Sequence, residues 1–419
     1  MMNDLSESDH LFWIYIFLMV NHRKCNEFFQ KYLQDLNLSP FATLRTLLHK
    51  MSVVSKATPR PDMIWWHGDV VTVGEISVDI TKYKLFLQKK LNETEKFVEE
   101  HVLLDLFKLH ELDDMCNTSK LRDLSQAEDV LGNGILLDLR NRRFDNPESA
   151  QLFLKMLQSG KLDMKQDAAG SIKFGKLAGL KWISDIDRAL SEIQSLCHTT
   201  QGPGVGRMTE QALQTPINTL NGSRNVIFEN GEHTGGFRSG YHKGSFTTGQ
   251  HKEILRLLPY RVFRLLYVLI RIIRPIELAA LFNLLIPPDN RQATVDAYRE
   301  RIWASYGRAW TPLHLSEKLQ QFMQRGMGVK MSARPYRHFA IAVQRHYSET
   351  NYGRYETDSK AQIYATAADL MAGHTPEVAE MHYARIGGNV LTSSTLKAAY
   401  IRVCKDWHAF LGFSTSRDD

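Results

Sequence analysis

The amino-acid sequence predicts a mainly α-helical protein with a small β-sheet. Three observations predict this fold class. Long segments carry apolar residues at steps of three and four, which is the period of an amphipathic helix. Stretches rich in β-branched and aromatic residues are short and are bounded by glycines. The composition, with 43% hydrophobic and 23% charged residues in a chain of 419, is that of an ordinary globular protein.

The N-terminal half is expected to be mostly helical. Residues 10–36 have dense apolar periodicity, and residues 81–111 place leucines and valines among lysines and glutamates. Between them, residues 65–74 predict a small hairpin. Residues 112–148 are mostly polar apart from the apolar run 135–137, which predicts a long loop or a loosely packed insert.

Residues 159–176 predict a linker, because small and polar residues with scattered lysines fill this stretch. A helix over residues 177–196 follows it, with leucines and isoleucines at helical steps, and glycines and a proline at 202–206 end this helix. The linker would divide the chain into a helical N-terminal domain, residues 1–158, and a second domain, residues 177–419.

The second domain is expected to hold the sheet. Residues 226–228 and the neighbourhood of 241–244 predict short strands, with a turn at the glycine that ends the second. A helix rich in leucine and isoleucine spans 258–285. Residues 302–350 predict a short strand and two helices, and residues 359–383 predict helices that a glycine interrupts.

Several classes of protein are disfavoured. The cysteines are scattered without a CxxC pair, which argues against disulfides and a zinc site and suits a reducing compartment. They are Cys25, Cys116, Cys197 and Cys404. The apolar run 11–20 has half the length of a membrane span and follows acidic residues, so a buried helix is expected, with no membrane partner. The glycines at 170 and 175 with Lys176 imitate a phosphate loop, but Leu177 replaces the magnesium-binding Ser or Thr.

The formal charge of +6 is unevenly distributed. Residues 173–419 carry 31 basic against 21 acidic side chains, whereas residues 1–172 carry 21 against 25. The basic half is where an anionic partner would dock. Nucleic acid is one interpretation, and a moderately basic soluble domain is the other.

Five residues, in chain order, supply what attack on a phosphodiester requires. A tyrosine can be the nucleophile, arginines can grip the non-bridging oxygens, and a lysine can protonate the leaving oxygen. The residues are Arg207, Lys243, Arg337, His374 and Tyr383. Each has an ordinary interpretation alone, as a local ion pair, a turn lysine, a surface charge or a buried aromatic. Their order and spacing together favour one site.

This ordered set resembles the catalytic domain of tyrosine recombinases, and the interval from Gly373-His374 to Tyr383 matches that family's spacing. The surrounding motifs resemble the eukaryotic Crypton-type branch and the recombinase-like region of RecQ-type helicase-like open reading frames. They are Gly202-Pro203-Gly204-Val205-Gly206-Arg207-Met208-Thr209-Glu210, Tyr241-His242-Lys243, Thr248-Gly249-Gln250, Arg256-Leu257-Leu258-Pro259, Tyr336-Arg337-His338 and Asp406-Trp407-His408. The resemblance covers residues 175–413. It implies a tyrosine-recombinase-like catalytic domain, preceded by a helical domain that either is core-binding-like and clamps one side of the duplex or contacts another protein.

The resemblance also implies roles. Arg207 and Arg337 would bind the scissile phosphate together with His374, and Glu210 would orient Arg207. Lys243 would be the general acid, and Tyr383 would form a 3′-phosphotyrosyl link.

Two features of the sequence bear on these roles. Arg334 stands where the family usually has histidine, and an arginine cannot accept the tyrosine proton, so His338 or a water would have to do so. A second Arg-x-x-Glu motif, Arg274 to Glu277, is rejected because it follows Lys243 in the chain, where the family has a packing helix.

The expected function is therefore site-specific breaking and rejoining of double-stranded DNA by a nuclear enzyme of mobile-element origin, acting in DNA recombination or integration. No metal and no other cofactor is expected, and the family's assembly is a homotetramer on paired sites. Two alternatives stay open. One is a catalytically degenerate DNA-binding protein, and the other is the recombinase-like part of a longer helicase-like polypeptide.

Overall fold

A computed structural model describes residues 64–115, 134, 147–168, 170–220, 222–229, 233–239, 254–352, 367–368, 371 and 393–415. The chain divides into two compact units, Met1–Asp62 and Met63–Asp419. The described residues belong to the second unit, so the helix expected at 10–36 lies outside them. The described part is mostly helical with small antiparallel sheets, as the sequence predicts.

An antiparallel meander opens the described part, formed by β1 (Ile64–His67), β2 (Val70–Val73) and β3 (Ile76–Asp79). The hairpin predicted at 65–74 is confirmed, with a third strand added to it. Helix α4 (Ile80–Phe97) follows directly, because the Asp79 carboxylate accepts the Lys82 backbone N–H at 3.0 Å and caps the first turn.

The amphipathic pattern at 81–111 is not one continuous helix. Helix α4 continues into a π-helical turn, η1 (Val98–Val102), and the chain then takes left-handed conformations at Leu104 and Asp105, both with φ of 58°. A non-glycine residue rarely adopts this conformation, and two in a row end the helix. Helix α5 (Leu109–Met115) restarts the chain.

The polar stretch 112–148 falls largely outside the described residues. Helix α6 (Pro147–Gln158) follows it, and part of the stretch predicted as a linker is ordered as a short helix and a two-stranded hairpin. These are η5 (Lys161–Asp163), β4 (Lys165–Gln166) and β5 (Ile172–Lys173). The domain boundary placed in this stretch stays a prediction.

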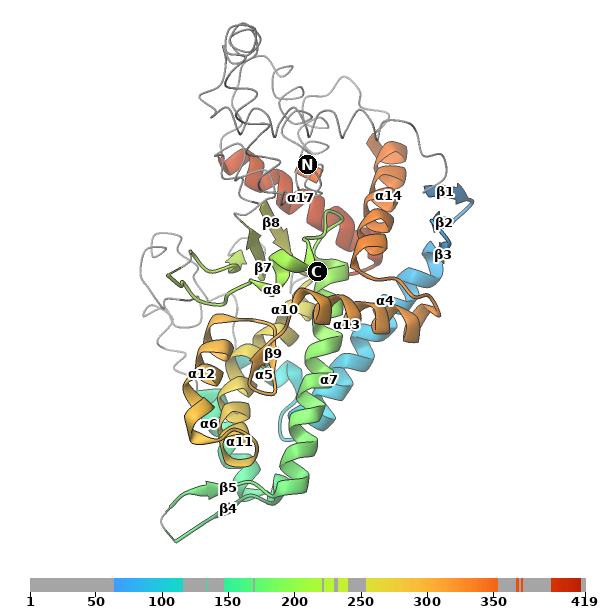
Figure 1. The fold of residues 1–419 in the computed structure, drawn as a ribbon. Helices are drawn as coiled ribbons and strands as arrows, with labels where there is room; N and C mark the ends of the chain where they lie inside the picture. Colours follow the sequence, from blue (N-terminus) through green and yellow to red (C-terminus); the bar gives the residue numbers. More distant parts are fainter. Residues whose placement is uncertain are drawn as a thin grey trace, which may run out of the picture. The chain divides into compact units, whose positions relative to one another are not determined.

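Helix α7 (Lys176–Thr200) is the central element, and its second half is buried at every position from Ala189 onward. Helices α4, α10, α11, α13 and α17 all pack against it (Figure 1). Buried hydroxyls in this half bond back to the helix itself, as when Thr200 Oγ1 donates to the Leu196 carbonyl at 2.7 Å. The helix predicted at 177–196 is thus confirmed and is slightly longer.

A three-stranded antiparallel sheet stands beside this helix, with the order β6 (Val226–Glu229), β7 (Thr234–Ser239), β8 (Ile254–Leu257). The strand at 226–228 is confirmed, but its partner is β7, which the sequence did not predict. Gly235 and Gly236 lower the strand propensity of β7. Gly236 is needed, because a Cβ there would collide with the backbone of β8. The strand expected at 241–244 lies outside the described residues.

The remaining elements are helices and one short ladder. The helix predicted at 258–285 is three consecutive segments, and the prediction for 302–350 is confirmed as two helices after the ladder. In chain order the elements are α8 (Met208–Ala212), α10 (Tyr260–Tyr267), η6 (Val268–Ile273), α11 (Arg274–Leu284), η7 (Pro288–Asn290), α12 (Arg291–Glu300), β9 (Ala304–Ser305), β10 (Arg308–Ala309), α13 (Pro312–Met327), α14 (Ala333–Tyr352) and α17 (Ser393–Leu411).

One hydrophobic cluster extends from Val71 in β2 to Leu411 in α17. It ties α4 to α14 through a direct contact of two fully buried tyrosines, since the Tyr83 and Tyr336 hydroxyls lie 2.8 Å apart. A smaller cluster joins β8 to α17 through Leu257 and Cys404. Together these clusters fix β8, α14 and α17 around the C-terminal end of α7 (Figure 1).

Candidate phosphate-binding site

The loop that leaves α7 carries Arg207 to the start of α8. Gly202 turns the chain with a φ of 112°, and a Cβ there would meet the side chains of Met371 and Cys404, so glycine is required for close packing. Arg207 is extended at the N-cap of α8, and its backbone N–H donates to Glu210 Oε2 at 3.3 Å. Glu210 therefore holds the backbone of Arg207.

Arg337 comes to the same place from a distant part of the sequence. It lies on α14 directly after Tyr336, whose fully buried hydroxyl donates to the Thr199 carbonyl at the end of α7 at 3.3 Å. The pKa of Arg337 is lowered to about 10, mainly by burial and then by the positive charges of Arg207 and Arg256, while the Glu210 carboxylate opposes them. Arg207 and Arg337 thus share one electrostatic neighbourhood.

Arg256, the first residue of the motif Arg256-Leu257-Leu258-Pro259, is a third cation there. It lies on β8 with 4% of its surface exposed. Its Nε donates to the Gly204 carbonyl at 2.8 Å, and its Nη2 donates to the Met371 carbonyl at 3.0 Å. Burial lowers its pKa, and Glu210 is the first of the groups that oppose this shift. An arginine within an otherwise apolar strand was the available signal.

His198 is a buried neutral group beneath these cations. It lies on the last turns of α7, and burial lowers its pKa to about 3, with Arg256 and Arg337 contributing in the same direction and Gln211 opposing. A histidine with this pKa is uncharged at physiological pH. It was missed because a histidine near a helix end has no distinguishing sequence pattern.

Arg334 and His338 lie one helical turn apart on α14. Arg334 is exposed, and His338 is half-buried. Burial lowers the pKa of His338, and the charges of Arg334 and Arg337 lower it too. A neutral imidazole has a nitrogen able to accept a proton, which is the role expected of His338 or a water.

The other predicted catalytic residues, Lys243, His374 and Tyr383, lie outside the described residues. Lys243 belongs to the connection between β7 and β8, which pair antiparallel from Gly236–Leu257 to Ser239–Ile254. Met371 lies two residues before Gly373 and is described. Of the five predicted catalytic residues, the structure therefore brings together Arg207 and Arg337 and tests none of the other three.

The second Arg-x-x-Glu motif has a structural role. Arg274 is buried on α11 and donates to the backbone carbonyls of Tyr298, Arg301 and Ile302. Glu277 accepts the Tyr298 hydroxyl at 2.6 Å, and burial raises its pKa to about 7. These contacts lock α11 to the end of α12.

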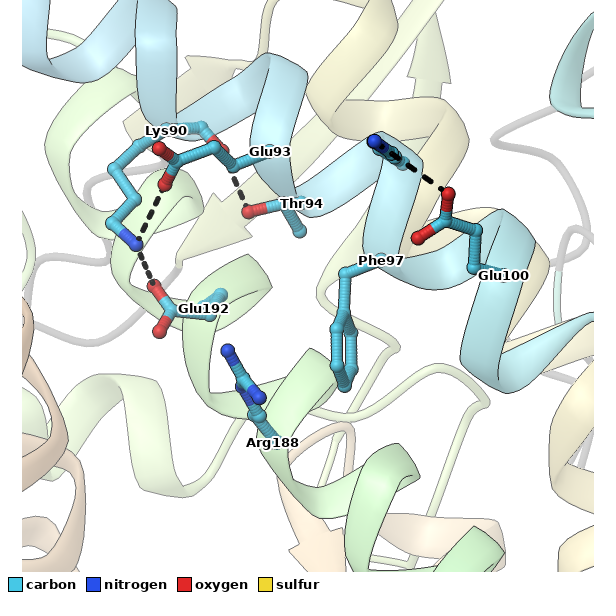
Figure 2. A pocket seen from close by; sticks show the side chains of 8 residues that line it. Lys90, Glu93, Thr94, Phe97, Glu100, Arg188 and Glu192 are labelled. Atoms are coloured by element: carbon cyan, nitrogen blue, oxygen red, sulfur yellow. Dashed lines mark hydrogen bonds and ion pairs between the residues drawn. The ribbon is translucent and has the colours of Figure 1, made fainter.

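A pocket of about 230 Å³ lies between α4 and α7. Figure 2 shows Arg188 directed into it between Glu192 and Phe97, with the guanidinium 4.4 Å from the Phe97 ring centroid. Its charges are largely paired, because Lys90 lies 3.1 Å from Glu93 and 3.9 Å from Glu192. This arrangement joins two helices and offers no free cluster of one sign.

Among the residues that the structure describes, no helix is both long and apolar enough to cross a bilayer. In the same part of the chain, no group of three or more His, Cys, Asp or Glu side chains is placed to hold a metal ion. Comparison of the chain with protein-family models, with curated proteins and with solved structures finds no match.

Proposed function

We propose that this protein breaks and rejoins double-stranded DNA through a covalent phosphotyrosyl intermediate at Tyr383. The proposal joins the sequence resemblance to one structural observation, the shared neighbourhood of Arg207 and Arg337. The charge of Arg207 lowers the pKa of Arg337, so an anion bound near both guanidinium groups would offset their repulsion. A phosphodiester is such an anion, and the arginine fork fits two of its oxygens.

The chemistry follows from the residue types. The Tyr383 oxygen attacks phosphorus and forms a new P–O bond, while the bond from phosphorus to the 5′-oxygen breaks. Lys243 gives that oxygen a proton, and a neutral His338 or a water takes the proton of the tyrosine. Arg207 and Arg337 stabilise the extra negative charge of the transition state. A 5′-hydroxyl then attacks the phosphotyrosine and reverses these steps. The energy of the broken bond is kept in the phosphotyrosine, so no ATP is needed.

The proposed setting is that of the resembled family. The substrate is duplex DNA in the nucleus, the assembly is a homotetramer on paired sites, and the origin is a mobile element. Net basic charge in residues 173–419 supports an anionic partner.

A binding-only function is the second candidate, and Arg334 is the observation that favours it. Its exposed guanidinium stands where the resembled family has a proton acceptor. An arginine can still bind phosphate but cannot accept a proton near neutral pH. A protein of this kind would bind duplex DNA with a steep salt dependence and would form no covalent product.

The test uses the full chain with a random-sequence duplex library that carries nicks, which trap the intermediate by letting the short 5′ product dissociate. The wild type is expected to form a protein–DNA adduct that survives denaturant. Lys243→Ala should slow adduct formation by roughly 10² to 10⁴-fold without loss of DNA binding, because the leaving oxygen loses its acid.

The outcomes separate the two functions. An adduct that needs Lys243 supports strand transfer. Salt-dependent binding with no adduct from any library member supports the binding-only function and contradicts strand transfer.

A further inference from the structure

Arg256 makes contacts that serve two separate parts of the chain. Its guanidinium is bonded on one side to the Gly204 carbonyl at 2.8 Å and on another to the Met371 carbonyl at 3.0 Å. Gly204 belongs to the loop that carries Arg207. Met371 precedes the Gly373-His374 motif by two residues in the sequence.

The backbone of Arg256 is itself held rigidly. It pairs with Phe237 across β7 and β8, and its own carbonyl lies so close to Gly236 that no Cβ fits there. The next residue, Leu257, donates its backbone N–H to Cys404 Sγ on α17 at 3.3 Å. The guanidinium is therefore presented from a fixed strand rather than from a flexible loop.

The charge of Arg256 also acts on the site. Among the groups that raise the pKa of Arg256, Glu210, which holds the backbone of Arg207, has the largest effect. The charge of Arg256 in turn lowers the pKa of Arg337. Gly206 lies against both, since a Cβ there would be 3.4 Å from Glu210 Oε2 and 3.8 Å from Arg256 Nη1. Arg256 thus contacts the Arg207 loop and faces the carboxylate that supports it.

We propose that Arg256 is a positioning residue, which fixes the Arg207 loop against the backbone at Met371 so that Arg207 meets the scissile phosphate in one geometry. The expected effect of Arg256 on the adduct rate rests on the proposed strand-transfer function. Its expected effect on the order of the Arg207 loop does not. Only a planar guanidinium spans both carbonyls while keeping its charge, so lysine is not an equivalent here.

The experiment compares Arg256→Lys with Arg274→Lys. Arg274 is a matched control, because it is also buried and also bonded to backbone carbonyls, but it locks α11 to α12 outside the site. Three quantities are measured on each full-length variant: the melting temperature, the affinity for nicked duplex DNA, and the adduct rate at saturating DNA. Hydrogen exchange of the peptides covering 202–212 and 296–303 is measured without DNA.

Arg256→Lys is expected to lower the adduct rate at saturating DNA by roughly 10²-fold, since small displacements of a positioned group have effects of this size. DNA affinity should change little, because the charge is kept. Exchange should accelerate at 202–212. Arg274→Lys should accelerate exchange at 296–303 and leave the adduct rate unchanged.

Equal effects of both variants on rate, or an unchanged exchange at 202–212 in Arg256→Lys, would overturn the inference and leave Arg256 a purely structural residue. If the wild type forms no adduct, the strand-transfer proposal fails by itself. The exchange comparison then still decides whether Arg256 fixes the Arg207 loop.

Discussion

Three arginines of the candidate site lie close enough for at least two of them to affect the charge of the third. Burial is the main cost of keeping Arg337 charged, and the positive charges of Arg207 and Arg256 add to it. The Glu210 carboxylate acts in the opposite direction and favours the charged form of Arg337. Under the proposed function, the cost of keeping this charge buried would be offset when a phosphate binds.

Arg337→Met is therefore expected to leave the folded protein as stable as the wild type or more stable, by up to roughly 2 kcal/mol. The lowered pKa means that the folded state disfavours the charge at every pH below about 10, so its removal relieves a cost at pH 7. Urea unfolding at pH 7 measures the difference. Arg345→Met, an exposed position on the same helix, is the control. A loss of more than about 3 kcal/mol, typical of breaking a buried ion pair, would contradict this account.

Two buried histidines predict sensitivity to acid. Burial lowers the pKa of His198 to about 3 and that of His408 to about 4, from an ordinary value of 6.5. The unfolded chain takes up these protons near pH 6.5 and the folded chain only near 3 to 4. The contribution of the two histidines to the free energy of unfolding is thus fully present above pH 6.5. It falls below that pH by roughly 1.4 kcal/mol per pH unit for each histidine.

His408→Gln should make this decline shallower between pH 6.5 and 4.5, although it lowers stability at pH 7. The lost contacts are those to the Thr200 carbonyl at 2.9 Å and to the Thr415 hydroxyl at 2.8 Å. Urea unfolding across this pH range gives the slope. A variant with the wild-type slope would show that His408 is not among the groups responsible.

At the scale of elements, hydrogen bonds to the end of α7 hold the helices that frame the site. The Thr199 carbonyl accepts from Trp407 Nε1 on α17 at 3.1 Å and from the Tyr336 hydroxyl on α14 at 3.3 Å. Tyr336 in turn accepts from Tyr83 on α4, which is a chain of donors through fully buried groups.

Removing either hydroxyl tests this chain of contacts. Tyr83→Phe removes only the hydroxyl that donates to Tyr336 and should cost about 1 kcal/mol. Tyr336→Phe leaves the Tyr83 hydroxyl buried without its partner and should cost about 2 to 3 kcal/mol. Chemical denaturation of the two single variants gives both values, and the reverse order of costs would show that the bonds run differently.

The elements also show what periodicity can and cannot predict. Helices α13 and α14 and the first half of α7 were predictable because each buries one face at three- and four-residue steps. Helix α12 was not predicted, since only Thr294 and Tyr298 of it are buried and its other positions are polar. Strand β7 was missed because its two glycines are required by contacts with other elements, which local sequence does not encode.

At the scale of the whole molecule, acidic and basic halves of the sequence pair with each other. Glu95 on α4 forms ion pairs with Arg261 and Arg264 on α10, the latter at 2.8 Å. Part of the acidic excess of residues 1–172 thus neutralises arginines of the basic half rather than facing a partner.

The candidate site was predictable only in part, because some of its contacts join segments that are distant in the sequence. Arg207, Glu210 and Arg337 could be selected by their order and spacing, because the resembled family keeps them in that order. Arg256 could not be selected in this way. Its guanidinium bonds to the carbonyls of Gly204 and Met371, which are far apart in the sequence and are brought together only by folding.

The most direct test of the central claim is to identify the residue that becomes linked to DNA. After trapping on nicked duplex, trypsin and nuclease digestion leave a nucleotide remnant that mass spectrometry can locate. The account predicts the remnant on Tyr383, within the tryptic peptide 361–385, and its loss in Tyr383→Phe. A remnant on another residue, or an adduct that persists in Tyr383→Phe, would contradict it.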